Sequence, residues 1–219
     1  MERILSLIAV VALPMIAVIF SSDRKKINWR LVGTGIALQF VFALLVLKTG
    51  PGRDFFGFIG SSASELMKIG DAGSGFVFGK LTDPSGAWGF LFAFKVLPTI
   101  VFFASLTSVL YYLGIMQMIV SVISKVIGRL LGTSGAETLC ASANIFMGQT
   151  EAPLLIKPYI TGLTRSELMV VMVSGFGTLA AGIMLIYAGM MEAFLPSAAG
   201  HLLAASVMSC PATILMAKI

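Results

Sequence analysis

Charge is scarce in this chain of 219 residues: only 11% of them are Asp, Glu, Lys or Arg, whereas 58% are hydrophobic. A soluble domain of this length needs far more charge on its surface. The alternation of polar and apolar residues that marks the strands of a membrane barrel is also missing. The composition therefore indicates an all-α polytopic membrane protein.

Histidine and cysteine are scarce too, which limits the chemistry. His201 is the sole histidine, and Cys140 and Cys210 lie in apolar segments where buried free thiols are expected. The sequence offers no nucleophile–histidine pair and no cluster of His, Cys and Asp, so it disfavours an enzyme. The net charge of +5 does not indicate a nucleic-acid partner, because the basic residues lie between apolar runs rather than in one patch.

About five apolar runs are long enough to cross a membrane and to contact its lipids. They cover residues 4–20, 31–47, 88–112, 166–187 and 201–216. The strongest cluster of basic residues, 24–30, follows the first run and marks an inside loop, which places the N-terminus outside. A single membrane domain over 1–219 is therefore expected.

Two further segments are expected at the membrane surface as interfacial helices. Residues 117–131 carry their polar side chains on one face of a helix, and residues 54–67 form a second amphipathic pattern. Residues 70–85 are rich in Gly, Asp, Ser and Pro, which predicts a loop. Lys95 lies inside the run 88–112, where it either serves the function or pairs with a carboxylate.

The most unusual stretch of the sequence runs from Asn144 to Pro153 and reads NIFMGQTEAP. It places two amides, a hydroxyl and a carboxylate inside an apolar segment, next to the helix breaker Gly148. Polar groups in hydrocarbon are costly unless they are satisfied or used. The stretch therefore predicts half of a solute-binding site, and a polar contact between packed helices is the alternative.

Basic residues flank the segment 136–159 on both sides, so both of its ends prefer the inside of the membrane. This pattern predicts one re-entrant helical hairpin over 136–159. A helix over 136–143 leads into a turn at 144–148, and a second half-helix follows. Thr150 is expected to cap that half-helix, with Pro153 in its first turn.

The predicted span 166–187 adds a stripe of small and hydroxyl side chains. Ser174, Thr178 and Gly182 are spaced by four residues, which places them on one face of a continuous helix. Close packing by small residues explains such a stripe. The alternative is that Thr178 lends a hydroxyl to an ion next to the hairpin.

The motif ANIFMGQTEAPLLIKPY at 143–159 resembles the signature of concentrative nucleoside transporters. The segments KVLPTIVFF at 95–103 and VLYYLGIMQ at 109–117 look like the third span of the same family. The resemblance implies a sodium-coupled nucleoside symporter of the plasma membrane, which is the inner membrane in a bacterium. It also implies a homotrimer that uses no cofactor other than Na⁺ as the coupling ion.

The resemblance further implies roles for individual residues. The polar hairpin residues that match the family's contacts to the nucleobase are Gln149, Thr150 and Glu151. The residues that match the sodium ligands are Asn144 and Thr178, with the backbone carbonyls of Met147 and Leu179.

Family members continue well beyond this length, with a second hairpin and further spans that complete the site. The chain looks like the N-terminal half, so the resemblance predicts half of a site and no transport by this chain alone. Two other functions stay open: a proton-coupled nucleoside symporter, and a truncated scaffold fragment that does not transport.

Overall fold

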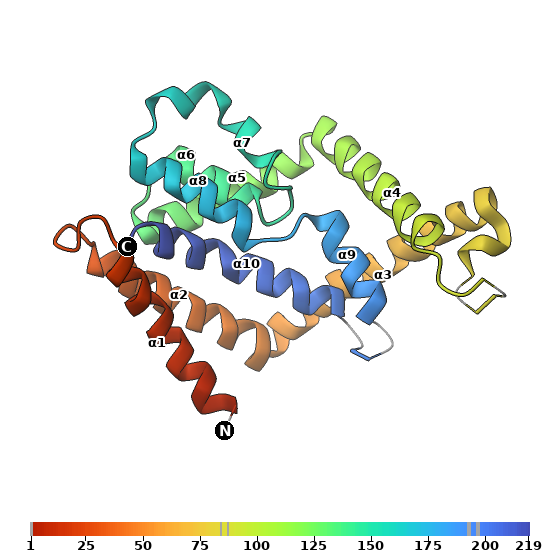
Figure 1. The fold of residues 1–219 in the computed structure, drawn as a ribbon, viewed down its shortest axis with the longest axis horizontal. Helices are drawn as coiled ribbons and strands as arrows, with labels where there is room; N and C mark the ends of the chain where they lie inside the picture. Colours follow the sequence, from red (N-terminus) through yellow and green to blue (C-terminus); the bar gives the residue numbers. More distant parts are fainter. Residues whose placement is uncertain (1, 84, 87, 192–193, 196–197) are drawn as a thin grey trace.

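The structure is a computed structural model that describes residues 2–83, 85–86, 88–191, 194–195 and 198–219. All regular structure in these residues is helical. The α-helices, in chain order (Figure 1), are α1 (Glu2–Phe20), α2 (Trp29–Lys48), α3 (Gly50–Phe78), α4 (Phe92–Tyr112), α5 (Ile115–Leu131), α6 (Gly135–Ala143), α7 (Ala152–Leu155), α8 (Arg165–Gly177), α9 (Ala181–Met191) and α10 (Ala198–Ala217). Two 3-10 segments, η1 (Gly79–Thr82) and η2 (Lys157–Gly162), follow α3 and α7.

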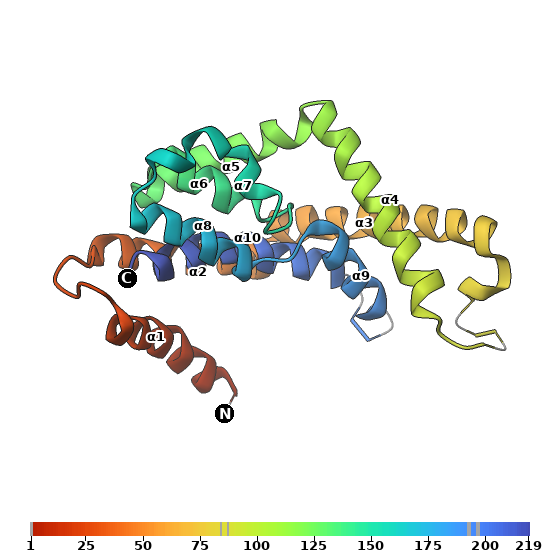
Figure 2. The ribbon, with the colours of Figure 1, turned by 45° about the horizontal axis from the view of Figure 1, so that its top comes forward.

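Four helical segments in the described part of the chain have the length and apolar composition of membrane spans. They are Trp29–Val46, Phe92–Tyr112, Arg165–Met191 and Ala198–Ala217. Helix α1 occupies the first predicted run. A loop joins it to α2, and the two helices diverge from this loop (Figure 2). Large apolar side chains face outward, such as Phe20 at 83% exposure and Leu44 at 58%, as lipid contact requires. The predicted all-α membrane fold is confirmed.

Helix α3 corrects the prediction for the segment that follows α2. It runs unbroken through the predicted surface helix 54–67 and through most of the predicted loop 70–85. Two of the small residues that suggested a loop, Gly70 and Ser74, are buried instead. A side chain on Gly70 would lie only 3.1 Å from the ring of Phe102 in α4.

The contact between α3 and α4 contains an ion pair. Lys95 Nζ lies 2.7 Å from Asp71 Oδ2, and both side chains are partly exposed. Of the two sequence-based alternatives for Lys95, pairing with a carboxylate is therefore the one observed. The carboxylate of Asp71 thus compensates the charge of Lys95.

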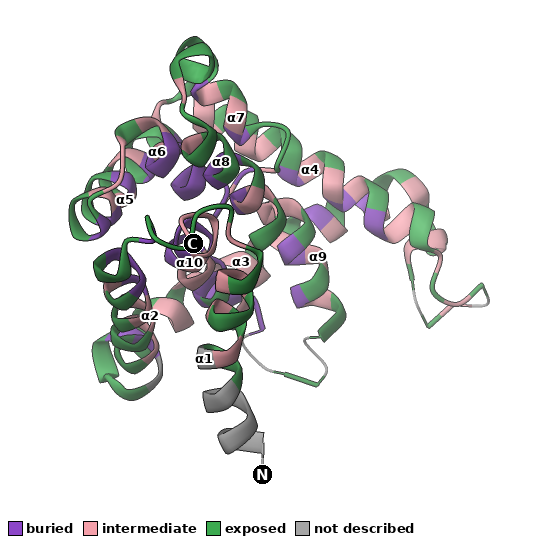
Figure 3. Ribbon diagram, turned by 60° about the vertical axis from the view of Figure 1, so that its left-hand side comes forward, coloured by how far each residue is buried: buried purple, intermediate pink, exposed green. Residues whose placement is uncertain are grey.

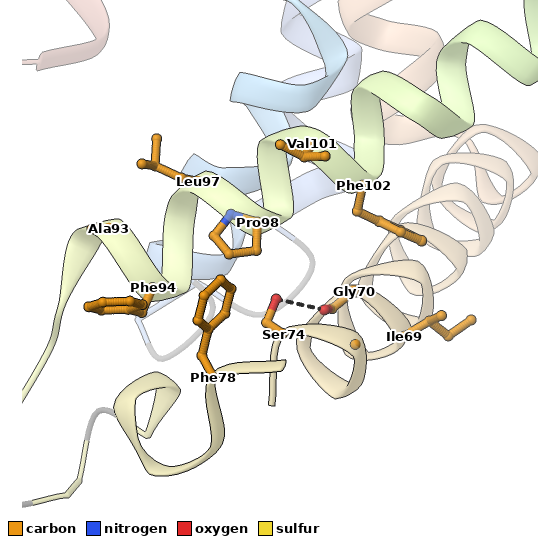
Figure 4. Close-up of a pocket in the computed structure, with 11 residues that line it drawn as sticks. Ile69, Gly70, Ser74, Phe78, Ala93, Phe94, Leu97, Pro98, Val101 and Phe102 are labelled. Carbon is orange, nitrogen blue, oxygen red and sulfur yellow. Dashed lines mark hydrogen bonds between the residues drawn. The ribbon is translucent and has the colours of Figure 1, made fainter. Parts of the chain in front are cut away.

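An apolar cavity of about 780 Å³ also lies between α3 and α4 (Figure 4). Its lining includes Phe78, Phe94, Pro98 and Phe102. The hydroxyl of Ser74 at its wall donates to the carbonyl of Gly70 at 2.9 Å. The cavity offers no charged side chain, so it does not suit a polar solute.

Helix α5 covers the predicted interfacial segment 117–131, and Lys125 and Arg129 of its predicted polar face are exposed. Ser124 is buried, whereas the apolar Met118 and Val122 are 64% and 57% exposed. Helix α5 packs against α6, and there Thr138 lies beside Gly128. The buried part of α5 thus packs on α6, and the position of α5 at the membrane surface stays a prediction.

Helix α10 lies at the centre of the fold and packs against α2, α3, α8 and α9. Its residues Cys210 and Ile214 are completely buried. Figure 3 shows buried residues gathered where α6, α8 and α10 meet. This packed centre, and not the open contact between α3 and α4, holds the polar stretch.

Candidate functional site

The polar stretch forms the turn between α6 and α7, and there the chain reverses its direction (Figure 1). The backbone N–H of Met147 donates to Ala143 O at 2.9 Å, and that of Ala152 donates to Gly148 O at 3.1 Å. The second arm is shorter than predicted, because α7 has only four residues. Its N-cap is Glu151, so the prediction of Thr150 at that position is wrong.

A second interrupted helix faces this turn, where the sequence predicted one continuous span over 166–187. Helix α8 ends at Gly177, and Thr178 has extended backbone angles of φ −135 and ψ 161. Helix α9 starts at Ala181, whose N–H donates to Phe146 O at 2.9 Å. This hydrogen bond from the turn satisfies a group that the broken helix leaves free, which stabilises the break.

The break also separates Gly182 from Ser174 and Thr178, which a continuous helix would align on one face. Ser174 and Thr178 remain linked, because the Thr178 hydroxyl donates to Ser174 O at 3.3 Å. Gly182 lies beyond the break in α9, where it faces Phe103 of α4. The predicted stripe therefore holds for its first two members and fails for the third.

Asn144 is the most buried of the predicted site residues, with no exposed surface. The Ser174 hydroxyl donates to Val171 O at 3.0 Å, so toward Asn144 it acts as an acceptor. The Asn144 Nδ2 donates to it at 2.9 Å. This orientation leaves Asn144 Oδ1 buried without a hydrogen-bond partner among the described residues. A buried oxygen of this kind is costly unless a ligand uses it.

Further oxygen atoms lie in the two segments that are not helical. No group among the described residues donates a hydrogen bond to the backbone carbonyl of Met147 or to that of Leu179. Thr178 and Leu179 also line a cavity of about 170 Å³ between the helix break and α10. This cavity is smaller than the pockets that hold drug-sized molecules, which begin at roughly 300 Å³, and its described lining does not include Asn144 or Met147.

The three predicted nucleobase contacts form the exposed surface of the turn. Gln149, Thr150 and Glu151 are all solvent-exposed. Gln149 packs tightly on α8, because a side chain on Gly175 would lie 2.9 Å from its Cβ. The Glu151 carboxylate accepts from the N–H of Gly148 at 3.5 Å. The turn thus presents an amide, a hydroxyl and a carboxylate side by side.

Sequence analysis missed one residue of this site in its proper role. Ser174 was part of the small-residue stripe, but in the structure it sets the orientation of the Asn144 amide. The four-residue spacing to Thr178 was the available signal. The pair of glycines around Phe176 was the corresponding signal for the helix break, because glycine weakens a helix interior.

Two interrupted helices whose breaks meet in an apolar setting define a class of protein, the secondary transporters. Comparisons with known proteins agree with this class. Residues 8–81 match the family described as Na+ dependent nucleoside transporter N-terminus. Residues 93–194 match the family described as Nucleoside recognition.

The chain is 46% identical, over its whole length of 219 residues, to an uncharacterized transporter of Haemophilus influenzae, of which it covers 51%. Over 201 residues it is 42% identical to human solute carrier family 28 member 3, covering 92% of this chain and 28% of that protein. The structure of CNTnw in an inward-facing substrate-bound state has a TM-score of 0.90 and 42% identity, covering 100% of this chain and 52% of that one.

The chain belongs to the concentrative nucleoside transporter family, and it matches the N-terminal half of that family's proteins. It spans about half the length of the bacterial relative and of CNTnw. The resemblance found in the sequence is confirmed at the level of family, fold and integral membrane character. The bacterial relative is named as a transporter and the human relative as a solute carrier.

Proposed function

We propose that this chain is the N-terminal half of a sodium-coupled nucleoside symporter. In this proposal the chain holds the coupling ion, and it supplies one side of the nucleoside site. The observation that carries the proposal is the buried Asn144 Oδ1 without a partner, at the meeting point of two helix breaks. The assembled protein is a homotrimer of the plasma membrane, with its N-terminus outside.

Sodium binds to hard oxygen atoms, which unwound segments of transporter helices supply through side chains and free carbonyls. Asn144 Oδ1 and Thr178 Oγ1 provide two such atoms, and the carbonyls of Met147 and Leu179 provide two more. Neither an amide nor a hydroxyl takes up a proton near neutral pH. A donor set of this kind therefore favours a metal cation over a proton as the coupling ion.

The nucleobase is a planar ring with hydrogen-bond donors and acceptors on its edge. Gln149 can donate and accept, Thr150 can do both, and the Glu151 carboxylate accepts. Their position on one exposed turn next to the ion ligands supports the proposal, because an ion bound to Asn144 holds the same turn in place. The ribose contacts belong to the other half of the transporter.

The sodium ligands all lie in this chain, whereas the nucleoside site needs the other half. The first test therefore uses a chimera in which residues 1–219 replace the matching part of the Haemophilus influenzae relative. Proteoliposomes with the chimera are expected to take up radiolabelled uridine when an inward Na⁺ gradient is imposed, and not when choline replaces Na⁺. Equal uptake driven by a proton gradient without Na⁺ would contradict sodium coupling.

The second test substitutes the central ligand. Asn144→Leu is expected to lower sodium-dependent uptake by roughly 100-fold, since even the outer partners of metal ligands are worth about 10–100-fold in affinity. Gln39→Leu in α2 makes the same chemical change away from the site and is the matched control. Unchanged sodium dependence in Asn144→Leu would exclude this amide as a ligand.

A further inference from the structure

A buried carboxylate near the start of α6 takes no part in the proposed site. Glu137 is 1% exposed. Its Oε1 accepts from the N–H of Ser134 at 2.9 Å, as part of a capping box. Its Oε2 lies 2.7 Å from Nζ of Lys218, at the end of α10. Two helices far apart in the sequence are therefore joined by a charged pair.

Stability alone does not explain this pair. Removing two charges from water is expensive, and apolar residues of similar volume are often as stable or more stable at such places. What a buried pair adds is register, because a single rotation and translation of α6 places the carboxylate at Lys218 Nζ. Polar groups in packed helices are known to fix register in this way.

The register of α6 bears directly on the ion ligand. Glu137 and Asn144 are seven positions apart, which is roughly 10 Å along a helix. Helix α6 has only nine residues, and helices this short depend on tertiary contacts. Its other end is also held by α10, because the Ser206 hydroxyl donates to Ile145 O at 3.2 Å.

We propose that Lys218 is a positioning residue for the cation site: through Glu137 it fixes α6 against α10 and thereby holds the Asn144 amide in place. This inference rests on the proposed function, since it assigns the pair a role in ion affinity. Lys218 itself does not touch the ion. Its influence passes along two turns of α6.

The test separates stability from positioning by a double-mutant cycle in the full 219-residue chain, reconstituted in lipid nanodiscs. Hydrogen exchange of the turn 144–151 is measured with increasing NaCl, with choline chloride keeping the ionic strength constant, and the melting temperature is recorded in parallel. The variants are Lys218→Met, Glu137→Gln and the double variant. Glutamine keeps the oxygen that accepts from Ser134, so the helix cap is preserved.

Lys218→Met is expected to lower the melting temperature, because it leaves Glu137 buried and unpaired. It should also raise the Na⁺ concentration for half-maximal protection by roughly tenfold, as outer partners of metal ligands do. In the double variant the melting temperature recovers, but the Na⁺ requirement stays raised. Lys26→Met, in the exposed pair with Asp23, is the control and should change neither quantity.

Recovery of both quantities in the double variant would show that the pair only stabilises the fold, and would overturn the proposal. An unchanged Na⁺ requirement in Lys218→Met would overturn it as well. If Na⁺ fails to protect the turn of the unmodified chain, the proposed function fails instead. Hydrogen exchange of the turn in Na⁺-free buffer then tests the positioning role of Lys218. Faster exchange in the double variant than in the unmodified chain supports this role, and equal exchange refutes it.

Discussion

Two ion pairs in this chain have the same length and very different surroundings. Lys95 Nζ lies 2.7 Å from Asp71 Oδ2 between α4 and α3, and Lys218 Nζ lies 2.7 Å from Glu137 Oε2 between α10 and α6. The acidic side chain is 41% exposed in the first pair and 2% in the second. Exposure weakens the first pair, whereas loss of Lys218 from the second leaves Glu137 as an uncompensated buried charge.

The regions around these two pairs also differ, one being open and apolar and the other packed and polar. An open apolar cavity of about 780 Å³ lies between α3 and α4, whereas α6, α8 and α10 bury polar groups such as Asn144 and Ser174. A large apolar cavity in a membrane protein suits hydrocarbon and needs no specific ligand. A buried amide oxygen without a partner does need one. The partnerless oxygen of Asn144, rather than the larger cavity, is therefore the basis of the proposed ion site.

The largest effect in this comparison is expected at Glu151, the one charged side chain of the polar turn. Glu151→Gln in the chimera removes the charge and keeps the shape, and it should lower uridine uptake by about 100-fold, as loss of a hydrogen bond to a charged group does. Glu65→Gln, on the exposed surface of α3, is the control. Wild-type uptake and affinity in Glu151→Gln would refute a role for the charge.

A smaller effect is expected where α8 supports the turn. Gly175→Ala places a methyl group 2.9 Å from Gln149 Cβ, so the turn must shift. Displacement of a binding group by a fraction of an ångström should raise the half-saturating uridine concentration by about tenfold. Gly73→Ala in α3 meets no atom within 4 Å and is the matched control. Equal uridine affinity in the two variants would show that the turn tolerates the shift.

The sequence was sufficient for those features that depend on local chemistry. Apolar length predicted the helices, and the polar residues from Asn144 to Glu151 predicted a helix interruption inside an apolar segment. That the segment returns to the side of the membrane from which it came stays a prediction from the flanking basic residues. Each of these signals lies within the segment that it describes.

The features that the sequence did not predict depend on partners far along the chain. The break after Gly177 is stabilised by a hydrogen bond to Phe146, which lies outside the predicted span 166–187. Helix α3 continues past Gly70, which packs against Phe102 of α4. In both places a tertiary contact overrides the local preference, and a single sequence does not show such contacts.

The smallest effect is expected at the exposed ion pair. Lys95→Met removes the partner of Asp71, whose side chain is 41% exposed and therefore keeps its charge at a lower cost than a buried carboxylate would. The loss of unfolding free energy should be about 1 kcal/mol or less, the usual range for solvent-exposed pairs. Thermal melting of the nanodisc-reconstituted chain, with Lys218→Met measured beside it, checks the difference. If Lys95→Met loses as much unfolding free energy as Lys218→Met, burial does not distinguish the two pairs. The Glu137–Lys218 pair would then have no special role in fixing the register of α6.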